Sequence, residues 1–228
     1  MKKTAILLGA TGLTGNILLH RLLNDERYEK LILFSRSTTG IVNPKIEEHL
    51  IDLFWLKNEK EKFRADEVYC CIGTTKKKTP DENTYRMIDY GIPVTAAKLA
   101  AENGIPTFVV MSAMGADANS RMFYNRTKGE MERDVRATNV EHTYILRPSL
   151  IAGDRDEKRL FEGVAKGGMK LLDKVLTGSL KKYRSIHPET IAKAMIFAAN
   201  EGYGKKIIES DKIQELAEEA DLKNYYHD

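Results

Sequence analysis

The sequence contains few cysteines and no arrangement that would support a disulfide framework. Its two cysteines, Cys70 and Cys71, are adjacent in the chain. Neighbouring residues on a strand point to opposite faces, so a bond between these two would be strained. Two free thiols indicate a reducing compartment.

Long apolar runs and a strong charge imbalance are also absent. No stretch approaches the roughly 20 apolar residues that span a membrane. The apolar start of the chain imitates a signal peptide but passes at once into GATGLTG. The formal net charge of +3 over 228 residues gives no electrostatic case for nucleic acid. We therefore predict a cytoplasmic protein whose partners are neither membranes nor nucleic acids.

Several catalytic motifs are missing as well. The five histidines show no HxxxH or HxH spacing, so we predict no metal site. The sequence has no GxSxG nucleophile elbow and no P-loop GK[ST]. These absences argue against a zinc enzyme, an α/β-hydrolase and a P-loop nucleotidase.

What the sequence does contain is an alternation of short apolar runs with helical patterns. The runs predict strands at 4–8, 31–34, 46–53, 67–72, 107–111 and 142–146, and the patterns predict helices at 16–23, 84–102, 123–138 and 188–200. This alternation indicates βαβ units with right-handed connections and a parallel sheet. We predict an α/β fold, a Rossmann-type doubly wound parallel sheet, in a single domain covering residues 1–228.

The irregular segment 149–185 follows the last of these predicted strands. In an open α/β sheet this position lies beside the cleft at the carboxyl ends of the strands. The segment is interpreted as a small C-terminal region that covers the substrate, or alternatively as a structural excursion.

A glycine-rich loop directly follows the first predicted strand. The pattern GxxGxxG allows a tight turn, close approach of a pyrophosphate and packing of helix on strand. The helix that follows offers free N–H groups to phosphates. We predict cofactor contacts from Gly9, Thr11, Gly12, Leu13, Thr14 and Gly15. The alternative is a glycine turn used for packing.

The next strand bears on the choice of cofactor. Folds selective for NAD usually place an acid about 20 residues past the glycines. Here the strand ends in Ser35, Arg36 and Ser37, without a carboxylate. Because arginine suits a phosphate, we predict NADP(H) in preference to NAD(H), with an exposed loop arginine as the alternative. Asp52, after the third strand, is expected to meet the adenine or to serve as a surface or capping residue.

The fourth strand ends in Gly73, Thr74 and Thr75. These residues are expected either to contact the ribose or phosphates of the cofactor or to form a plain turn. The run Lys76–Lys78 behind them is interpreted as a solvated loop tip or as a phosphate or substrate contact.

The candidate catalytic residues are Ser112, Tyr124 and Lys128. Ser112 ends the fifth strand, and Tyr124 and Lys128 share one face of the next helix. Reducing a carbonyl needs a hydride from nicotinamide and a proton from a positioned donor. A phenol donates poorly at neutral pH unless a nearby ammonium lowers its pKa. We predict Tyr124 as acid/base, Lys128 as pKa modulator and ribose ligand, and Ser112 as anchor of the substrate oxygen. The alternative is a turn serine, a packed tyrosine and a solvated lysine.

Together with Leu146–Pro148 (LRP), these motifs resemble the short-chain dehydrogenase/reductase superfamily. LLGATGLTG, CCIGTT, YNRTKGEME and LRPSLIAGDR are similar to its atypical group of Tat-interacting-protein-like oxidoreductases. The resemblance covers most of residues 4–200 and implies a Rossmann-type fold, bound NADP, the triad Ser112, Tyr124 and Lys128, and Pro148 near the nicotinamide. Relatives often have a Ser-Ser pair where this chain has Ser112-Ala113.

The expected function is an NADP(H)-dependent oxidoreductase that reduces a small carbonyl compound or oxidises the matching alcohol. One alternative is an NADP-binding regulatory protein with little turnover. A weaker one is a nucleotide-sugar epimerase, for whose substrate domain residues 149–185 are too few. We also expect a possible homodimer, paired through the helices at 84–102 and 123–138.

Overall fold

The computed structural model describes residues 2–152 and 182–225. The strands of this part form one sheet, in the order β3-β2-β1-β4-β5-β6-β7, and every neighbouring pair is parallel. The strands are β1 (Lys3–Leu8), β2 (Tyr28–Ser35), β3 (Ile46–Leu50), β4 (Glu67–Cys70), β5 (Thr107–Met111), β6 (His142–Arg147) and β7 (Ile207–Glu209). The strand order reverses between β1 and β4, so the predicted doubly wound Rossmann-type fold is confirmed.

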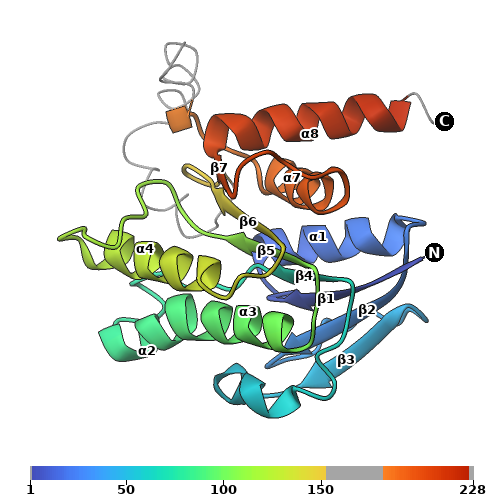
Figure 1. Cartoon of the computed structure of the whole chain (residues 1–228), viewed down its shortest axis with the longest axis horizontal. Helices are drawn as coiled ribbons and strands as arrows, with labels where there is room; N and C mark the ends of the chain where they lie inside the picture. Colours follow the sequence, from blue (N-terminus) through green and yellow to red (C-terminus); the bar gives the residue numbers. More distant parts are fainter. Residues whose placement is uncertain (1, 153–181, 226–228) are drawn as a thin grey trace.

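Helices cover both faces of the sheet (Figure 1). One layer contains α1 (Leu13–Asn24) and α7 (Pro188–Glu201), with α8 (Ser210–Tyr225) packed on α7. The other layer contains η1 (Leu53–Glu59), α2 (Glu82–Arg86), the π-helical turn η2 (Met87–Gly91), α3 (Ile92–Glu102) and α4 (Phe123–Arg136). In a sheet of this kind a ligand binds at the carboxyl ends of the central strands.

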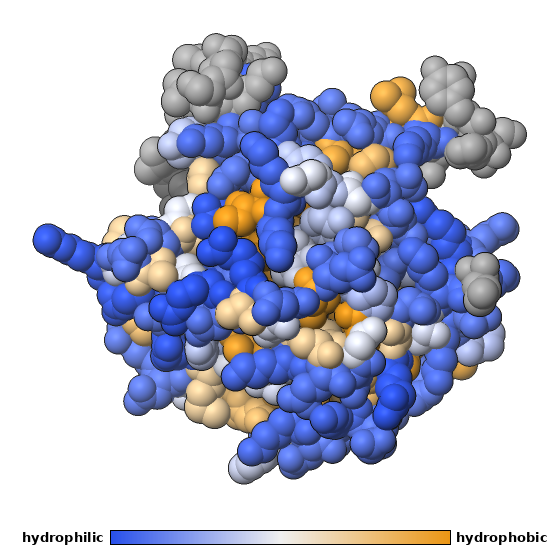
Figure 2. Space-filling model, viewed as in Figure 1, coloured by the Kyte–Doolittle hydropathy of each residue, from blue (hydrophilic) through white to orange (hydrophobic). Residues whose placement is uncertain are grey.

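The surface is mainly hydrophilic on the face drawn in Figure 2, and its apolar residues form small separate patches. Large exposed side chains such as Val42, Trp55 and Met122 are scattered along the chain. Among the described residues, no helix combines the length and the apolar character needed to cross a membrane.

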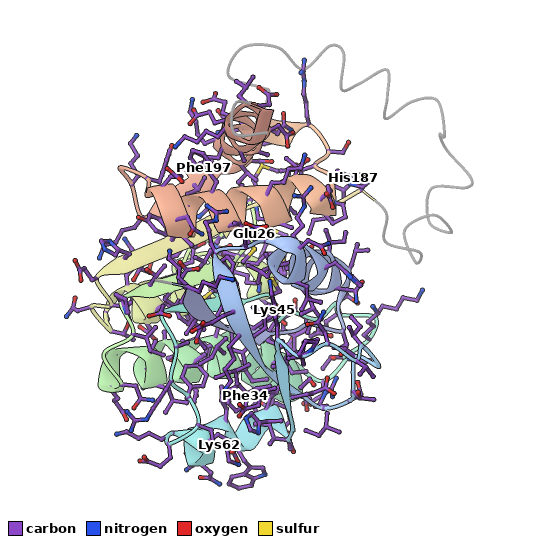
Figure 3. All side chains as sticks on the ribbon, turned by 90° about the vertical axis from the view of Figure 1, so that its right-hand side faces the viewer. Glu26, Phe34, Lys45, Lys62, His187 and Phe197 are labelled. Atoms are coloured by element: carbon purple, nitrogen blue, oxygen red, sulfur yellow. The ribbon has the colours of Figure 1, made fainter. Side chains whose placement is uncertain are left out.

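Two apolar cores lie on opposite sides of the sheet because side chains alternate along each strand. Leu33 packs in the core beneath α1 and α7, and its neighbour Phe34 packs in the core beneath η1 and α3. Figure 3 shows this division through Phe34 on one side and Phe197 of α7 on the other. Burial on both faces explains why the central strands read as continuous apolar runs.

The same alternation separates the two cysteines. Both are free and buried, with Cys70 in the core beneath η1 and α3 and Cys71 in the core beneath α1 and α7.

The element boundaries differ from the prediction in identifiable places. The helix predicted at 84–102 is divided by the π-helical turn η2. The strand predicted at 46–53 ends at Leu50, because the chain turns into η1. The elements β7 and α8 were not predicted. Residues 153–181 of the expected cap lie outside the described part, and its flanks pair in an isolated bridge between Ile151 and Ile186.

Candidate cofactor and proton-transfer site

The glycine loop packs so tightly that side chains are excluded at two of its positions. Gly9 has φ +89°, and a Cβ there would lie 2.8 Å from the carbonyl oxygen of Cys71. A Cβ on Gly15 would lie 2.0 Å from the carbonyl oxygen of Gly9. The loop therefore lies against the end of β4, at the point where the strand order reverses.

Helix α1 begins in this loop without a side-chain cap. Gly12 is the N-cap residue, and no side chain accepts from the first turn. The first N–H groups of a helix have no partner within the helix, and they favour an anion. Bare backbone and free donors are the two properties that a pyrophosphate needs, so this loop fits a dinucleotide.

Arg36 lies in a turn at the carboxyl end of β2. The buried Ser35 holds this turn by donating from Oγ to the carbonyl of Ser37 at 2.8 Å. Arg36 is exposed, and its guanidinium has no ion pair or hydrogen bond within the described part of the chain. Its donors are thus available to an external phosphate.

Asp52 has the capping role that the sequence left open. Its carboxylate accepts from the backbone N–H of Phe54 at 3.0 Å and caps η1. Its contact with the adenine stays a prediction.

The loop after β4 is held by a buried carboxylate. Asp89 of the π turn η2 accepts from the backbone N–H of Thr74 at 2.8 Å. A Cβ on Gly73 would lie 3.5 Å from Oδ1 of Asp89 and 3.7 Å from Nζ of Lys128. Thr75, the third residue predicted to contact the cofactor here, is exposed. Because Gly73 has no side chain, the backbone stays close to two buried charges, those of Asp89 and Lys128.

Those two charges form an ion pair. Nζ of Lys128 lies 2.8 Å from Oδ1 of Asp89, and both residues are almost fully buried. Burial disfavours the Lys128 ammonium, but Asp89 and Tyr124 outweigh it, so the pKa of Lys128 is raised above its ordinary value. Lys128 is therefore a fixed positive charge at the start of α4, and the alternative of a solvated lysine is excluded.

Tyr124 lies one turn before Lys128 on α4 and is 41% exposed. Desolvation raises the pKa of its phenol, Lys128 lowers it and Asp89 raises it, so that the pKa is above its ordinary value. Lys128 acts in the predicted direction but does not prevail, because desolvation and, to a smaller extent, Asp89 hold the pKa of Tyr124 above its ordinary value. The predicted net lowering of this pKa is therefore wrong, and the sequence analysis did not include Asp89. The sequence signal for Asp89 is an acid inside an apolar helical stretch, and no spacing rule links that acid to Lys128.

Ser112 is buried at the end of β5 and engaged elsewhere. Its hydroxyl donates to Oε1 of Glu132 at 2.5 Å. Glu132 pairs with Arg147 at 2.6 Å, and Arg147 pairs with Glu209 at 3.1 Å. This network ties β5, α4, β6 and β7 together. The structure does not bring Ser112 to the groove that Tyr124 lines, and its role as oxygen anchor stays a prediction.

Pro148 lies on the same carboxyl edge of the sheet. It is buried directly after β6, and its carbonyl accepts from the backbone N–H of Met114 at 2.9 Å. Its proximity to the nicotinamide also stays a prediction.

A groove of about 260 Å³ opens beside Tyr124, between the loop after β4 and the first turns of α2 and α4. Its lining consists of Thr74, Thr75, Lys76, Tyr85, Phe123 and Tyr124. Lys76, which the sequence predicts at a solvated loop tip or at a phosphate or substrate contact, lies on the wall of this groove with its amine 2.8 Å from Glu82.

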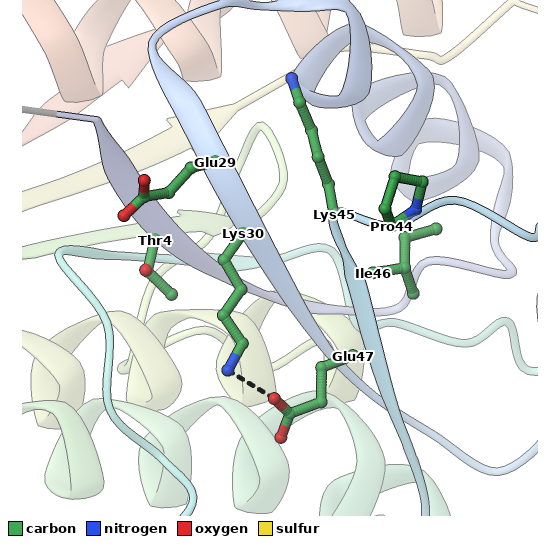
Figure 4. Close-up of a pocket in the computed structure, with 7 residues that line it drawn as sticks. All are labelled: Thr4, Glu29, Lys30, Pro44, Lys45, Ile46 and Glu47. Atoms are coloured by element: carbon green, nitrogen blue, oxygen red, sulfur yellow. Dashed lines mark ion pairs between the residues drawn. The ribbon is translucent and has the colours of Figure 1, made fainter.

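A larger hollow of about 510 Å³ lies at the opposite, amino ends of β1, β2 and β3 (Figure 4). It is crossed by the ion pair between Lys30 and Glu47 at 2.5 Å. This hollow is remote from the glycine loop, since the loop follows the carboxyl end of β1. The described residues contain no group of three or more histidine, cysteine or acidic side chains that could hold a metal ion.

Comparison with known proteins agrees with this geometry. A family model described as NAD(P)H-binding matches residues 9–201, which include the glycine loop, Asp89, Tyr124 and Lys128. The fold and the family model thus define a dinucleotide-binding Rossmann protein, and the chain belongs to the NAD(P)H-binding family.

The curated relatives include fungal proteins named FMP52, mitochondrial. The protein of Meyerozyma guilliermondii is 32% identical over 231 residues, covering 96% of this chain and 97% of the relative. The protein of Aspergillus niger is 33% identical over 202 residues, covering 84% of this chain and 85% of the relative. Because these relatives are named as mitochondrial proteins, the prediction of a cytoplasmic location is contradicted.

Solved structures share the fold at low sequence identity. A short-chain dehydrogenase family protein from Francisella tularensis matches with a TM-score of 0.69 at 12% identity, covering 93% of this chain and 99% of that one. A UDP-glucose 4-epimerase from Thermotoga maritima matches with a TM-score of 0.65 at 13% identity, covering 95% of this chain and 82% of that one.

Proposed function

We propose that the protein is an NADP(H)-dependent oxidoreductase that reduces a small carbonyl compound or oxidises the matching alcohol. The observation that carries this proposal is the buried ammonium of Lys128, one helical turn from Tyr124, which lines the groove. A short path connects it to the glycine loop: a Cβ on Gly9 would lie 2.8 Å from the carbonyl oxygen of Cys71, and a Cβ on Gly73 would lie 3.7 Å from Nζ of Lys128.

When bound, the nicotinamide supplies or accepts the hydride, and the residues of the chain manage the proton. In reduction, Tyr124 donates its phenolic proton to the carbonyl oxygen. In oxidation, the Tyr124 phenolate takes the proton of the alcohol. Lys128 stabilises that phenolate by its charge, and Asp89 fixes the position of the Lys128 amine.

The preference for NADP(H) rests on Arg36. Its guanidinium is exposed and free of partners within the residues that the structure describes, at the end of β2 where a dinucleotide places its adenosine ribose. A planar guanidinium binds a phosphate through two parallel hydrogen bonds.

Tyr124→Phe tests the mechanism. We expect kcat for carbonyl reduction to fall by at least about 100-fold, because a positioned acid contributes roughly that much, while NADPH affinity is unchanged. Tyr90→Phe is the matched control, since the Tyr90 hydroxyl donates to Asp134 and does not line the groove. Unchanged turnover in Tyr124→Phe would refute the assignment of Tyr124.

The alternative of an NADP-binding regulatory protein has its own signature. It would be favoured over an enzyme if the purified protein bound NADPH yet oxidised it with no member of a broad panel of aldehydes, ketones and quinones.

A further inference from the structure

The groove beside Tyr124 has a composition that selects among carbonyl compounds. We infer that it takes the ring of a flat, apolar carbonyl compound, an aromatic aldehyde or ketone, with the carbonyl oxygen at the Tyr124 hydroxyl. The inference rests on the proposed function for its redox step, but the binding preference can be measured without turnover.

Three aromatic rings form the apolar part of the groove. The buried ring of Tyr85 meets Phe123 edge to face at 5.5 Å between centroids, and it meets Tyr124 at 6.4 Å with an interplanar angle of 78°. Edge-to-face contacts match the positive edge of one ring to the negative face of another, and an aromatic guest extends the same pattern. A saturated ring of equal size has no such edge-to-face attraction to the three rings.

The polar side chains of the groove already have partners, with one exception. Thr74 and Thr79 share a hydrogen bond at 2.9 Å, and Lys76 is paired with Glu82. The remaining two polar side chains on the wall, Thr75 and Tyr85, bond to backbone groups.

Among the described residues that line the groove, the exception is the Tyr124 hydroxyl, which makes no hydrogen bond. A guest therefore finds the unpartnered Tyr124 hydroxyl beside three aromatic rings, on a wall that also carries Thr74, Thr75 and Lys76, whose side chains have partners. This matches a molecule with a single hydrogen-bonding oxygen.

The size and charge of the groove argue in the same direction. Its volume of about 260 Å³ lies just below the range of roughly 300–1,000 Å³ that is typical for drug-sized ligands, so one or two rings fill it. A nucleotide sugar carries a charged diphosphate and many hydroxyl groups, and the groove offers few free partners for them, since Lys76 is paired with Glu82 and Thr74 with Thr79. The epimerase alternative is therefore disfavoured at this groove.

The first experiment measures binding without cofactor. Calorimetry of the whole protein with benzyl alcohol and with cyclohexylmethanol compares an aromatic with a saturated ring at a constant hydroxyl. We expect benzyl alcohol to bind about three- to ten-fold more tightly, since aromatic pairing contributes on that scale. UDP-glucose is expected not to displace it. Equal affinity for the two alcohols would overturn the inference.

Variants locate the preference. Phe123→Leu should abolish the difference between the two alcohols, and Met122→Leu should keep it because Met122 is exposed and outside the groove. If Phe123→Leu fails to fold, Thr75→Arg provides a second test. A long charged side chain on this exposed wall should weaken the binding of both alcohols. A ring preference that survives in folded Phe123→Leu, or full affinity in Thr75→Arg, contradicts the inference.

Turnover separates this inference from the proposed function. With NADPH, the wild type should reduce benzaldehyde with a lower KM than cyclohexanecarbaldehyde, and Phe123→Leu should raise that KM with little change in kcat. Selective binding of benzyl alcohol without any NADPH oxidation would refute the oxidoreductase but support the groove. Reduction of both aldehydes with equal KM would refute the groove but support the oxidoreductase.

Discussion

Asp89 and Lys128 decide the electrostatics around Tyr124. Two charges buried this deeply must compensate each other, because either one alone would carry a large desolvation cost. Since the pKa of Lys128 is raised in the folded state, the stability that protonation of Lys128 contributes is complete below the ordinary lysine pKa of about 10.4. It is lost only as the pH rises through the higher folded value. The pair therefore persists across neutral pH.

Asp89→Asn should move the pH dependence of the reaction. Asp89 raises the pKa of Tyr124, so removing its charge lowers that pKa. Alcohol oxidation needs the phenolate, and its rising limb should therefore shift to lower pH in a profile of kcat against pH.

Asp134→Asn is the control for this shift, because Asp134 lies on α4, the helix of Tyr124, and accepts a hydrogen bond from Tyr90. An unmoved limb in folded Asp89→Asn would contradict the electrostatic role of Asp89.

Arg36→Ala should weaken NADPH far more than NADH. Hydrogen bonds to a charged group contribute about 1.5–3 kcal/mol, which corresponds to roughly a 10- to 100-fold loss of affinity. Titration of nicotinamide fluorescence measures both cofactors.

Arg64→Ala provides the control for this comparison, since Arg64 precedes the amino end of β4 and pairs with Glu61. An equal loss of affinity for NADH and NADPH in Arg36→Ala would refute the proposal that Arg36 binds the 2′-phosphate of NADP(H).

At the scale of elements, the close approach of α4 to the loop before it depends on Gly129. A Cβ on this residue would lie 2.1 Å from the backbone nitrogen of Ala118. By contrast, Gly91 has helical angles, φ −63° and ψ −50°, and the nearest atom to a Cβ there is 4.0 Å away. Close packing therefore requires glycine at position 129, whereas alanine fits at position 91 without a clash.

Gly129→Ala should destabilise the protein by about 1–3 kcal/mol or more, because the backbone has to move. Gly91→Ala should stabilise it by about 0.4–1 kcal/mol, since alanine restricts the unfolded chain and favours the helix. Urea denaturation measures both. The packing account fails if the two variants shift the free energy of unfolding in the same direction.

Element patterns were predictable where the chain is apolar and regular. The core strands were found because β1, β2, β4 and β5 are buried on both faces. The three-residue β7 is too short to give a pattern, and α8 is rich in charged residues. The π turn η2 was not visible because it adds a residue to one turn without changing the apolar composition.

At the scale of the whole molecule, cofactor binding and stability are linked. A ligand that binds the folded state at 100 times its Kd adds about 2.7 kcal/mol to the free energy of unfolding. For a domain of this size, that corresponds to a rise in melting temperature of roughly 5–11 °C. Thermal melts with increasing NADPH should show this rise, and Arg36→Ala should show less at equal NADPH. A melting temperature that is independent of NADPH would contradict cofactor binding.

The candidate site was predictable as far as it depends on local spacing. The glycine loop and the pair Tyr124 and Lys128 lie within single segments, so their geometry follows from a turn or a helix. The partners of these residues do not, because Asp89 reaches Lys128 and Glu132 reaches Ser112 across separate elements. Those contacts are set by how the elements pack, which one sequence does not specify.

The central position of β1 has a consequence for synthesis on the ribosome. Its edge toward β2 is covered as soon as Tyr28–Ser35 has been made, but its other edge waits for Glu67–Cys70. Until then the glycine loop lacks the carbonyl of Cys71 against which Gly9 packs. The nascent chain therefore carries an open apolar strand edge through about a quarter of translation, and such edges promote aggregation. The binding loop can reach its final form only after that interval.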